Sequence, residues 1–129
     1  MRKGIMSLEA VVEPIAKSWV AFDLDGTLAE THPEGWQGIE HIGAPVPRMI
    51  ERIKRYIAEG KQVKIFTARV AAVSDTITLT YIESIIEAWC LLHVGKTLPI
   101  TNVKDMYMEY CYDDRCRQVV ENTGQVVGE

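Results

Sequence analysis

The chain has 129 residues, of which 47% are hydrophobic and 25% are charged, proportions typical of one soluble globular domain. Its formal net charge of −4 excludes a general attraction for nucleic acid. No stretch approaches the ~18 uninterrupted apolar residues that a membrane span needs. Glu9 and Glu13 interrupt the apolar residues after the basic start, which argues against a signal peptide. We therefore expect a cytoplasmic protein without a membrane partner.

The three cysteines, Cys90, Cys111 and Cys116, are odd in number and form no C-x-x-C pair. We interpret them as reduced thiols in or near the core. A zinc site is the alternative, but neither the cysteines nor the histidines show the spacing of zinc ligands.

Residues 1–17 are interpreted as an N-terminal leader, and residues 18–129 as a single domain. The leader contains a short stretch that predicts a helix weakened by Pro14. Residues 18–22 (SWVAF) are apolar and β-prone and are followed by charge and glycine, a pattern typical of a buried central strand.

A long irregular loop is predicted for residues 29–44, which are rich in glycine and carry two histidines and a tryptophan. Loops of this length in compact domains are usually functional or mobile. Pro45 and Pro47 then introduce a helix with apolar residues at helical spacing, and Gly60 marks its end. The run 63–66 predicts the second strand.

The same alternation continues in the second half of the chain. Residues 81–93 predict an amphipathic helix, 98–101 and 107–112 predict strands, and 125–127 predicts a small edge strand. Strands that alternate with helices are typical of a mainly parallel sheet wrapped on both faces. The sequence thus predicts an α/β fold, a Rossmann-like three-layer sandwich, in which ligands bind at the carboxyl ends of the strands.

The strongest chemical signal is the segment Asp23–Leu28 (DLDGTL), directly after the first predicted strand. Residues i and i+2 of a strand project to the same side, so the carboxylates of Asp23 and Asp25 can face one site. Gly26 allows a sharp turn there. Two converging carboxylates repel each other unless they share a cation or a proton, which predicts a hard metal ion with oxygen ligands.

This segment resembles the first motif of haloacid dehalogenase (HAD) phosphatases, D-x-D-G-T-L. Three later segments resemble the remaining motifs, in the same order and after apolar runs. Thr67 matches the threonine of the second motif, Lys104 matches the lysine of the third, and Asp113-Asp114 matches the paired-acid form of the fourth. The four motifs together span most of the chain.

The resemblance implies a role for each matching residue. Asp23 would attack phosphorus and form an aspartyl-phosphate, and Asp25 would protonate the leaving oxygen and then activate water. Mg²⁺ would be held by Asp23, by the backbone carbonyl of Asp25, and by Asp113 or Asp114, and would offset the repulsion between carboxylate and phosphate. Two further groups would bind the phosphoryl oxygens and stabilise the transition state. These are Thr67 and Lys104.

Each of these residues also has a purely structural interpretation. The two acids of the first motif can form a turn, the threonine can cap the next helix, and the paired acids can start a helix. Lys104 can be a solvated lysine with Asp105 as its ion-pair partner.

Further side chains near the motifs are candidates for binding substrate. Arg69 can bind a second anionic group of the substrate, with an ordinary surface ion pair as the alternative. Arg115 can do the same or neutralise the acids before it. His32, His41 and Trp36 lie in the loop that would form a flap over a HAD site, where they either contact substrate or pack the loop.

Two comparisons with the family narrow the substrate. The short spacing between the motifs leaves no room for a large cap domain, so the site would be open. Residues 63–69 (VKIFTAR) and 112–122 (YDDRCRQVVEN) resemble the phosphatase half of bacteriophage polynucleotide kinases, which acts on 3′ phosphates of nucleic acids. The helix over 48–61 carries a possible basic face. Its members are Arg48, Arg52, Lys54 and Arg55.

We therefore expect a Mg²⁺-dependent phosphomonoester hydrolase whose substrate is a small phosphorylated molecule or a nucleic-acid end. One alternative is a catalytically silent HAD-fold module that binds phosphate or a partner. Another is a phosphotransferase that uses the same residues.

Overall fold

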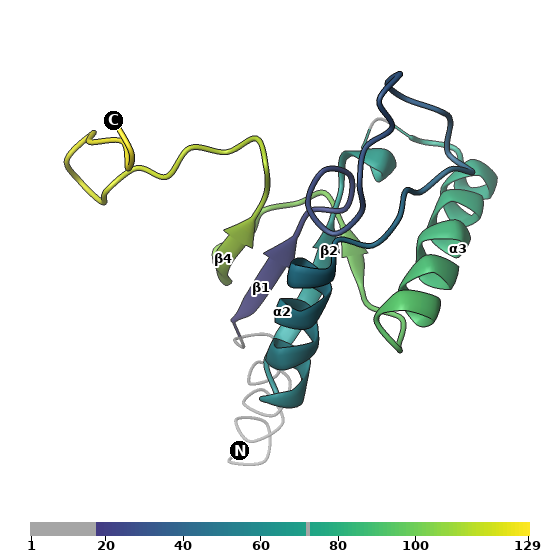
Figure 1. Cartoon of the computed structure of the whole chain (residues 1–129), viewed down its shortest axis with the longest axis horizontal. Helices are drawn as coiled ribbons and strands as arrows, with labels where there is room; N and C mark the ends of the chain where they lie inside the picture. Colours follow the sequence, from purple (N-terminus) through teal and green to yellow (C-terminus); the bar gives the residue numbers. More distant parts are fainter. Residues whose placement is uncertain (1–17, 72) are drawn as a thin grey trace, which may run out of the picture.

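The computed structural model describes residues 18–71 and 73–129. The predicted leader and its helix, residues 1–17, lie outside the described residues. The rest contains a four-stranded, all-parallel sheet in the order β3-β2-β1-β4 (Figure 1). Its strands are β1 (Trp19–Phe22), β2 (Gln62–Phe66), β3 (Ile100–Thr101) and β4 (Met108–Tyr112).

Helices connect the first three strands, as the alternating pattern predicts. Helix α2 (Pro47–Ala58) joins β1 to β2, and α3 (Thr76–His93) joins β2 to β3 after a short 3-10 helix, η1 (Ala68–Val70). Helix α3 begins five residues before the predicted Tyr81, at Thr76. The reason is its cap: the carboxylate of Asp75 accepts the backbone N–H of Thr78 at 2.6 Å.

The register aligns the carboxyl ends of β1, β2 and β4. Phe22, the last residue of β1, lies opposite Ile65 of β2 and Tyr112 of β4. Backbone hydrogen bonds continue just beyond the strands, from the N–H of Asp23 to the carbonyl of Tyr112 at 2.9 Å and from the N–H of Thr67 to that of Thr101 at 3.0 Å. The residues that follow each strand are therefore held at one edge of the sheet.

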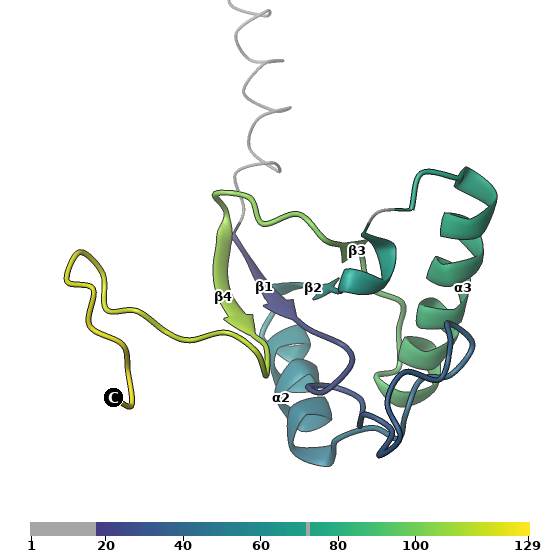
Figure 2. The same ribbon diagram turned by 90° about the horizontal axis from the view of Figure 1, so that it is seen from above.

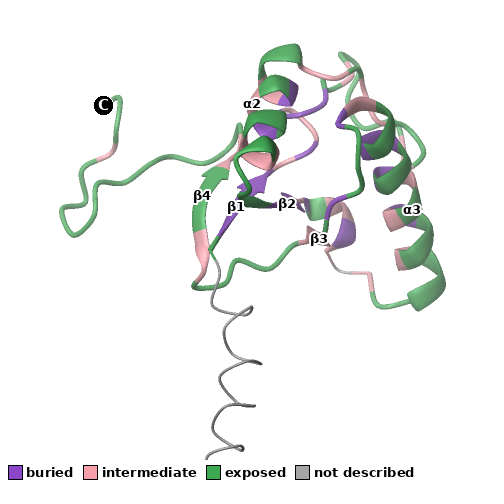
Figure 3. Cartoon of the chain, turned by 90° about the horizontal axis from the view of Figure 1, so that it is seen from below, coloured by how far each residue is buried: buried purple, intermediate pink, exposed green. Residues whose placement is uncertain are grey.

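Both helices pack on the same face of the sheet. The inward side chains of β1 and β2 and the apolar stripes of α2 and α3 belong to one core cluster, and Figure 3 shows buried positions on β1 and on both helices. Burial of this apolar surface is the main stabilising contribution. The strand members are Val20, Phe22, Val63 and Ile65, and the helix members include Ile50, Ile53, Ile82, Ile86 and Trp89.

The opposite face differs from the prediction of a three-layer sandwich. In residues 18–71 and 73–129, no helix covers that face, so the described part forms two of the three expected layers (Figure 2). A crossover helix needs a dozen or more residues, and the connection from β3 to β4 is only residues 102–107. This connection itself covers Trp19, whose indole N–H donates to Asp105 at 2.8 Å. Lys64 lies over the same ring, with its Nζ 4.4 Å from the ring centroid.

The segment after β4 extends away from the body of the molecule (Figures 1 and 2). The predicted edge strand at 125–127 is replaced there by an isolated antiparallel bridge between Val119 and Val126. This bridge closes a turn within the tail instead of extending the sheet. No helix of the described residues is long and apolar enough to cross a membrane.

Candidate phosphate and metal site

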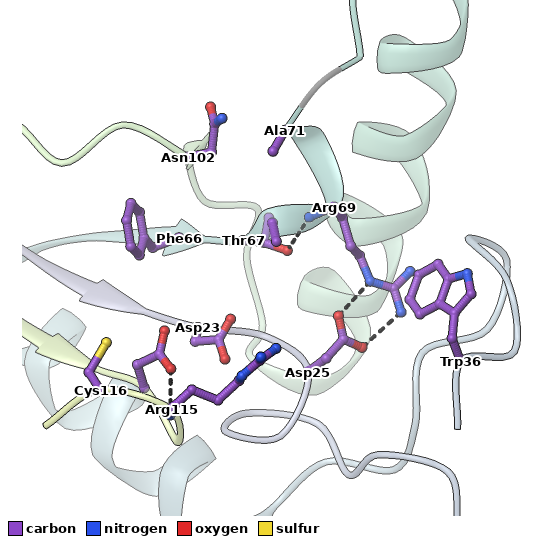
Figure 4. Close-up of a pocket in the computed structure, with 12 residues that line it drawn as sticks. Asp23, Asp25, Trp36, Phe66, Thr67, Arg69, Ala71, Asn102, Arg115 and Cys116 are labelled. Carbon is purple, nitrogen blue, oxygen red and sulfur yellow. Dashed lines mark hydrogen bonds and ion pairs between the residues drawn. The ribbon is translucent and has the colours of Figure 1, made fainter. Parts of the chain in front are cut away.

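Polar residues that follow all four strands line one cavity of about 680 Å³ at the carboxyl edge of the sheet (Figure 4). Asp23 follows β1, Thr67 follows β2, Asn102 follows β3 and Asp113 follows β4. Parallel strands present their carboxyl ends at the same edge, which is why residues so distant in sequence converge. The predicted candidates Asp23, Asp25, Thr67, Arg69 and Asp113 all line this cavity.

Three carboxylates form an acidic cluster at the site, and two of them, those of Asp23 and Asp113, line the cavity. Asp23, Asp113 and Asp114 each offer one oxygen, and the three oxygens lie within 4.8 Å of one another. Burial raises the pKa of Asp23 to about 7, and the nearby charge of Asp113 and a hydrogen bond with Asp114 add to the effect. Such a cluster of hard oxygen donors can hold a metal ion, and Mg²⁺ and Ca²⁺ prefer this type of ligand.

Two residues of the first motif position this cluster. The hydroxyl of the buried Thr27 lies 3.4 Å from an oxygen of Asp23 and 3.2 Å from one of Asp114, and it accepts the backbone N–H of Asp114 at 3.1 Å. Gly26 has a φ of +90°, and a Cβ there would lie 2.6 Å from Oδ2 of Asp114. Thr27 was not among the predicted site residues, although its position directly after Gly26 was a usable signal.

Asp25 does not join the acidic cluster. Its two oxygens accept from Arg69 in a bidentate ion pair, from Nε at 2.7 Å and from a terminal nitrogen at 2.8 Å. The part that the resemblance gives Asp25 in metal binding concerns its backbone carbonyl, and the ion pair of the side chain does not bear on it. The side chain itself lies at the other side of the cavity, beside the predicted flap.

The loop over residues 29–44 is closed at its base and leans on α3. The N–H of Glu30 donates to the carbonyl of Ala44 at 2.8 Å, and the indole N–H of Trp89 donates to the carbonyl of Gly43 at 3.0 Å. Trp36 is 63% exposed and lines the main cavity as well as a smaller one of about 160 Å³. Of these two cavities, His32 and His41 line the smaller one, where their rings meet edge to face at 5.8 Å.

The position of Thr67 is compatible with both of its predicted roles, which are to bind a phosphoryl oxygen and to cap the next helix. It is 3% exposed, and its hydroxyl oxygen accepts the backbone N–H of Arg69 at 3.1 Å, which caps the short helix η1. The hydroxyl also lines the cavity, with its own hydrogen still able to donate. Capping therefore orients the hydroxyl at the site.

The structure does not bring Lys104 to the lining of the cavity. Lys104 is exposed on the connection between β3 and β4. Within the described residues its side chain makes no hydrogen bond or ion pair. Asp105 is bound to Trp19 instead of Lys104. The first residue after β3, Asn102, lines the cavity in its place.

A second arginine, Arg115, points into the cavity toward Asp23 and Asp25 (Figure 4). Its backbone N–H donates to Asp113 at 2.8 Å, whereas its guanidinium has no ion-pair partner in residues 18–71 and 73–129. The neighbouring Cys116 also lines the cavity. Of the three cysteines, all of them free, only Cys90 is buried, so the expectation of thiols in or near the core holds for Cys90.

The predicted basic face of α2 is partly occupied by contacts within the chain. The guanidinium of Arg52 lies over the ring of Tyr112, 5.4 Å from its centroid, and Arg55 pairs with Glu51 at 3.5 Å. The hydroxyls of Tyr56 and Tyr112 are 2.8 Å apart, and this hydrogen bond raises the pKa of Tyr56 to about 12. The two contacts of Tyr112 with α2 fix the last residue of β4, directly before Asp113 and Asp114.

Comparison of the chain with protein-family models, with curated proteins and with solved structures gave no significant match. The residues of the site and their geometry are therefore the basis for assigning its function.

Proposed function

We propose that the protein is a Mg²⁺-dependent phosphatase of the HAD type, which hydrolyses phosphomonoesters through an aspartyl-phosphate on Asp23. The observation that carries the proposal is the convergence of Asp23, Asp113 and Asp114 within 4.8 Å. Two of these acids, Asp23 and Asp113, line one cavity with Thr67 at the carboxyl edge of a parallel sheet. Burial and the neighbouring acids together raise the pKa of Asp23 to about 7, and a carboxyl perturbed in this way is typical of a functional site.

The acidic cluster would hold the cation, together with the backbone carbonyl of Asp25. Bound Mg²⁺ supplies positive charge that offsets the repulsion between the nucleophile and the phosphate. Asp23, once ionised, attacks phosphorus, which splits one difficult hydrolysis into two easier steps. Thr67 donates its hydroxyl hydrogen to a phosphoryl oxygen, since its backbone contact uses only a lone pair.

Asp25 would act as the general acid and base for the leaving oxygen and the attacking water. It lines the cavity with Asp23, which supports this assignment. Lys104, the last candidate of the four motifs, does not line the cavity, so the proposal does not rest on it. Arg115 is a positively charged side chain that does point into the cavity.

We infer an open site without a large cap domain, which would admit a large or extended substrate as well as a small phosphorylated molecule. A nucleotide or a nucleic-acid 3′ phosphate is the preferred class within the proposal. The indole of Trp36, 63% exposed at the cavity, supports this preference because exposed aromatic rings stack on bases. A catalytically silent phosphate-binding module and a phosphotransferase remain the alternatives.

The test is phosphate release from p-nitrophenyl phosphate and from 3′-phosphorylated oligonucleotides, in Mg²⁺ and in EDTA. Asp23→Asn should lower the rate by about three orders of magnitude or more, since it removes the nucleophile. Glu51→Gln, the same change of carboxylate to amide on the exposed side of α2, should leave the rate unchanged. Free phosphate as the product separates hydrolysis from transfer to another acceptor.

A wild-type protein that binds Mg²⁺ and phosphate but releases no phosphate would contradict the catalytic proposal. The panel for that conclusion includes nucleotides, sugar phosphates and phosphopeptides. Such a result would support the silent module.

A further inference from the structure

The guanidinium of Arg69 is almost fully engaged by the protein itself. The side chain is 3% exposed, and four of its five N–H donors are used: two by Asp25, one by the carbonyl of Ile39 at 3.0 Å and one by the carbonyl of His41 at 2.7 Å. The face of the guanidinium lies against Trp36, 4.6 Å from the ring centroid. Figure 4 shows the bidentate pair and the stacked indole.

These contacts join three segments that are far apart in the sequence. Arg69 belongs to η1 after β2, Asp25 belongs to the first motif, and the two carbonyls belong to the predicted flap, residues 29–44. The backbone of Arg69 is itself fixed, because its N–H donates to the hydroxyl of Thr67 at 3.1 Å. The arginine is thus anchored at both ends.

A substrate anion would have to compete for the same donors. The fork that would meet a carboxylate or phosphate is already closed on Asp25, and two further donors point at backbone carbonyls. Displacing these partners would leave two backbone carbonyls without a hydrogen bond, which is unfavourable. Arg115 carries no such partners in the described residues and is better suited to meet an anion.

We propose that Arg69 is a positioning residue, which holds the carboxylate of Asp25 and the loop 29–44 in place at the rim of the cavity, instead of binding a second anionic group of the substrate. The loop and Asp25 are then oriented by one side chain. The kinetic part of this inference rests on the proposed function, whereas its structural part does not.

The structural part is tested by hydrogen–deuterium exchange of the whole protein without substrate. Arg69→Lys keeps a positive charge but loses the planar fork, so the amides of residues 36–44 should exchange at least tenfold faster. Arg48→Lys, the same change at an exposed position of α2, should leave the exchange of these residues unchanged. Equal exchange of this segment in Arg69→Lys and the wild type would overturn the proposal.

A second variant covers the case in which Arg69→Lys fails to fold. Asp25→Asn keeps the shape of the acid but removes its charge, so Arg69 loses its ion pair while its bonds to the two carbonyls remain. Exchange at 36–44 should then rise less than in Arg69→Lys. A wild-type exchange pattern in this variant, combined with an unfolded Arg69→Lys, would also overturn the proposal.

The kinetic part compares p-nitrophenyl phosphate with a nucleoside 3′,5′-bisphosphate, which carries a second anionic group. A positioning role predicts that Arg69→Lys lowers kcat for both substrates by the same factor, about 10- to 100-fold, with little change in KM. A rise in KM for the bisphosphate alone would overturn the proposal. If the wild type cleaves neither substrate, the proposed function fails, and the exchange experiment still decides the role of Arg69.

Discussion

Asp23 and Asp25 lie two residues apart, yet they have opposite surroundings. Asp23 faces two other acids from the end of β4, and its pKa is raised to about 7. Asp25 is held by two nitrogens of a buried arginine that follows β2. The site thus has an acidic side, formed by Asp23, Asp113 and Asp114, and a clamped side, formed by Asp25 and Arg69. The partners of the two aspartates follow different strands. The spacing of the two aspartates places both carboxylates at one edge of the sheet. Residues distant in sequence, the acids after β4 and the arginine after β2, then determine the chemistry of each carboxylate.

The largest expected effect concerns the glycine between the two sides. Gly26→Ala strains a backbone with a φ of +90° and pushes a Cβ to 2.6 Å from Asp114. We expect a loss of about 1–3 kcal/mol of stability, and a loss of Mg²⁺ affinity of about tenfold or more because an acid of the cluster moves. Thermal unfolding and calorimetric titration with Mg²⁺ measure the two effects.

Gly60 provides a matched control for this prediction. Its φ is +81°, but nothing lies within 4 Å of the Cβ that an alanine would add. Gly60→Ala should therefore show the backbone strain and leave Mg²⁺ affinity unchanged. Equal Mg²⁺ affinities in the two variants would mean that Asp114 takes no part in binding the cation.

The acidic side should also make the free energy of unfolding of the metal-free protein depend on pH. The folded pKa of Asp23, about 7, lies above its ordinary value of 3.8. Between these values the folded state holds a proton that the unfolded state releases, so the free energy of unfolding falls as the pH rises from about 4 to about 7. Asp23→Asn cannot ionise and should lose this part of the pH dependence.

Urea unfolding in EDTA at several pH values tests this prediction. Adding Mg²⁺ at pH 8 should restore stability to the wild type, because the cation offsets the repulsion among the ionised acids. The interpretation is wrong if the wild type and Asp23→Asn show the same dependence on pH.

A smaller effect on activity is expected on the clamped side, where α3 supports the loop. Trp89→Phe removes the indole N–H that donates to the carbonyl of Gly43 at 3.0 Å. We expect a loss of about 1–3 kcal/mol from the hydrogen bond and the smaller ring, with phosphatase activity reduced only a few-fold. Denaturant unfolding and steady-state kinetics give the two values.

Tyr81→Phe is the control for the loop support. Tyr81 also bonds to the loop, through Glu40 at 3.2 Å, but this contact is exposed. Its loss should change stability by about 0.5 kcal/mol or less. A larger loss in Tyr81→Phe than in Trp89→Phe would show that the loop is held from outside instead of through the core.

Much of the sheet edge was predictable from the sequence, because apolar runs and the polar residues after them are local signals. Asp23, Thr67 and Asp113 all lie where such runs end, and parallel pairing brings them together. The start of α3 was missed because a single capping residue, Asp75, extends the helix beyond its apolar pattern. Element boundaries often depend on one such side chain.

The contacts between distant segments were not predictable in the same way. The sequence suggested that Arg69 meets the substrate, but its partners come from loop carbonyls that carry no residue-specific signal. Lys104 matched a motif by order alone, and its exposed connection does not bring it to the cavity lining. The two-layer arrangement of the described residues follows from the short connection between β3 and β4, which the predicted strands at 98–101 and 107–112 already implied.

The position of β4 gives the acidic cluster a consequence for folding. In the described residues β4, which Asp113 and Asp114 follow, pairs only with β1. It is therefore an edge strand, on the side of β1 away from β2. A cation shared between these acids and Asp23 would tie the edge strand to the central one. Metal binding would then be coupled to the docking of this strand, and the cation would protect β4 most strongly against local unfolding.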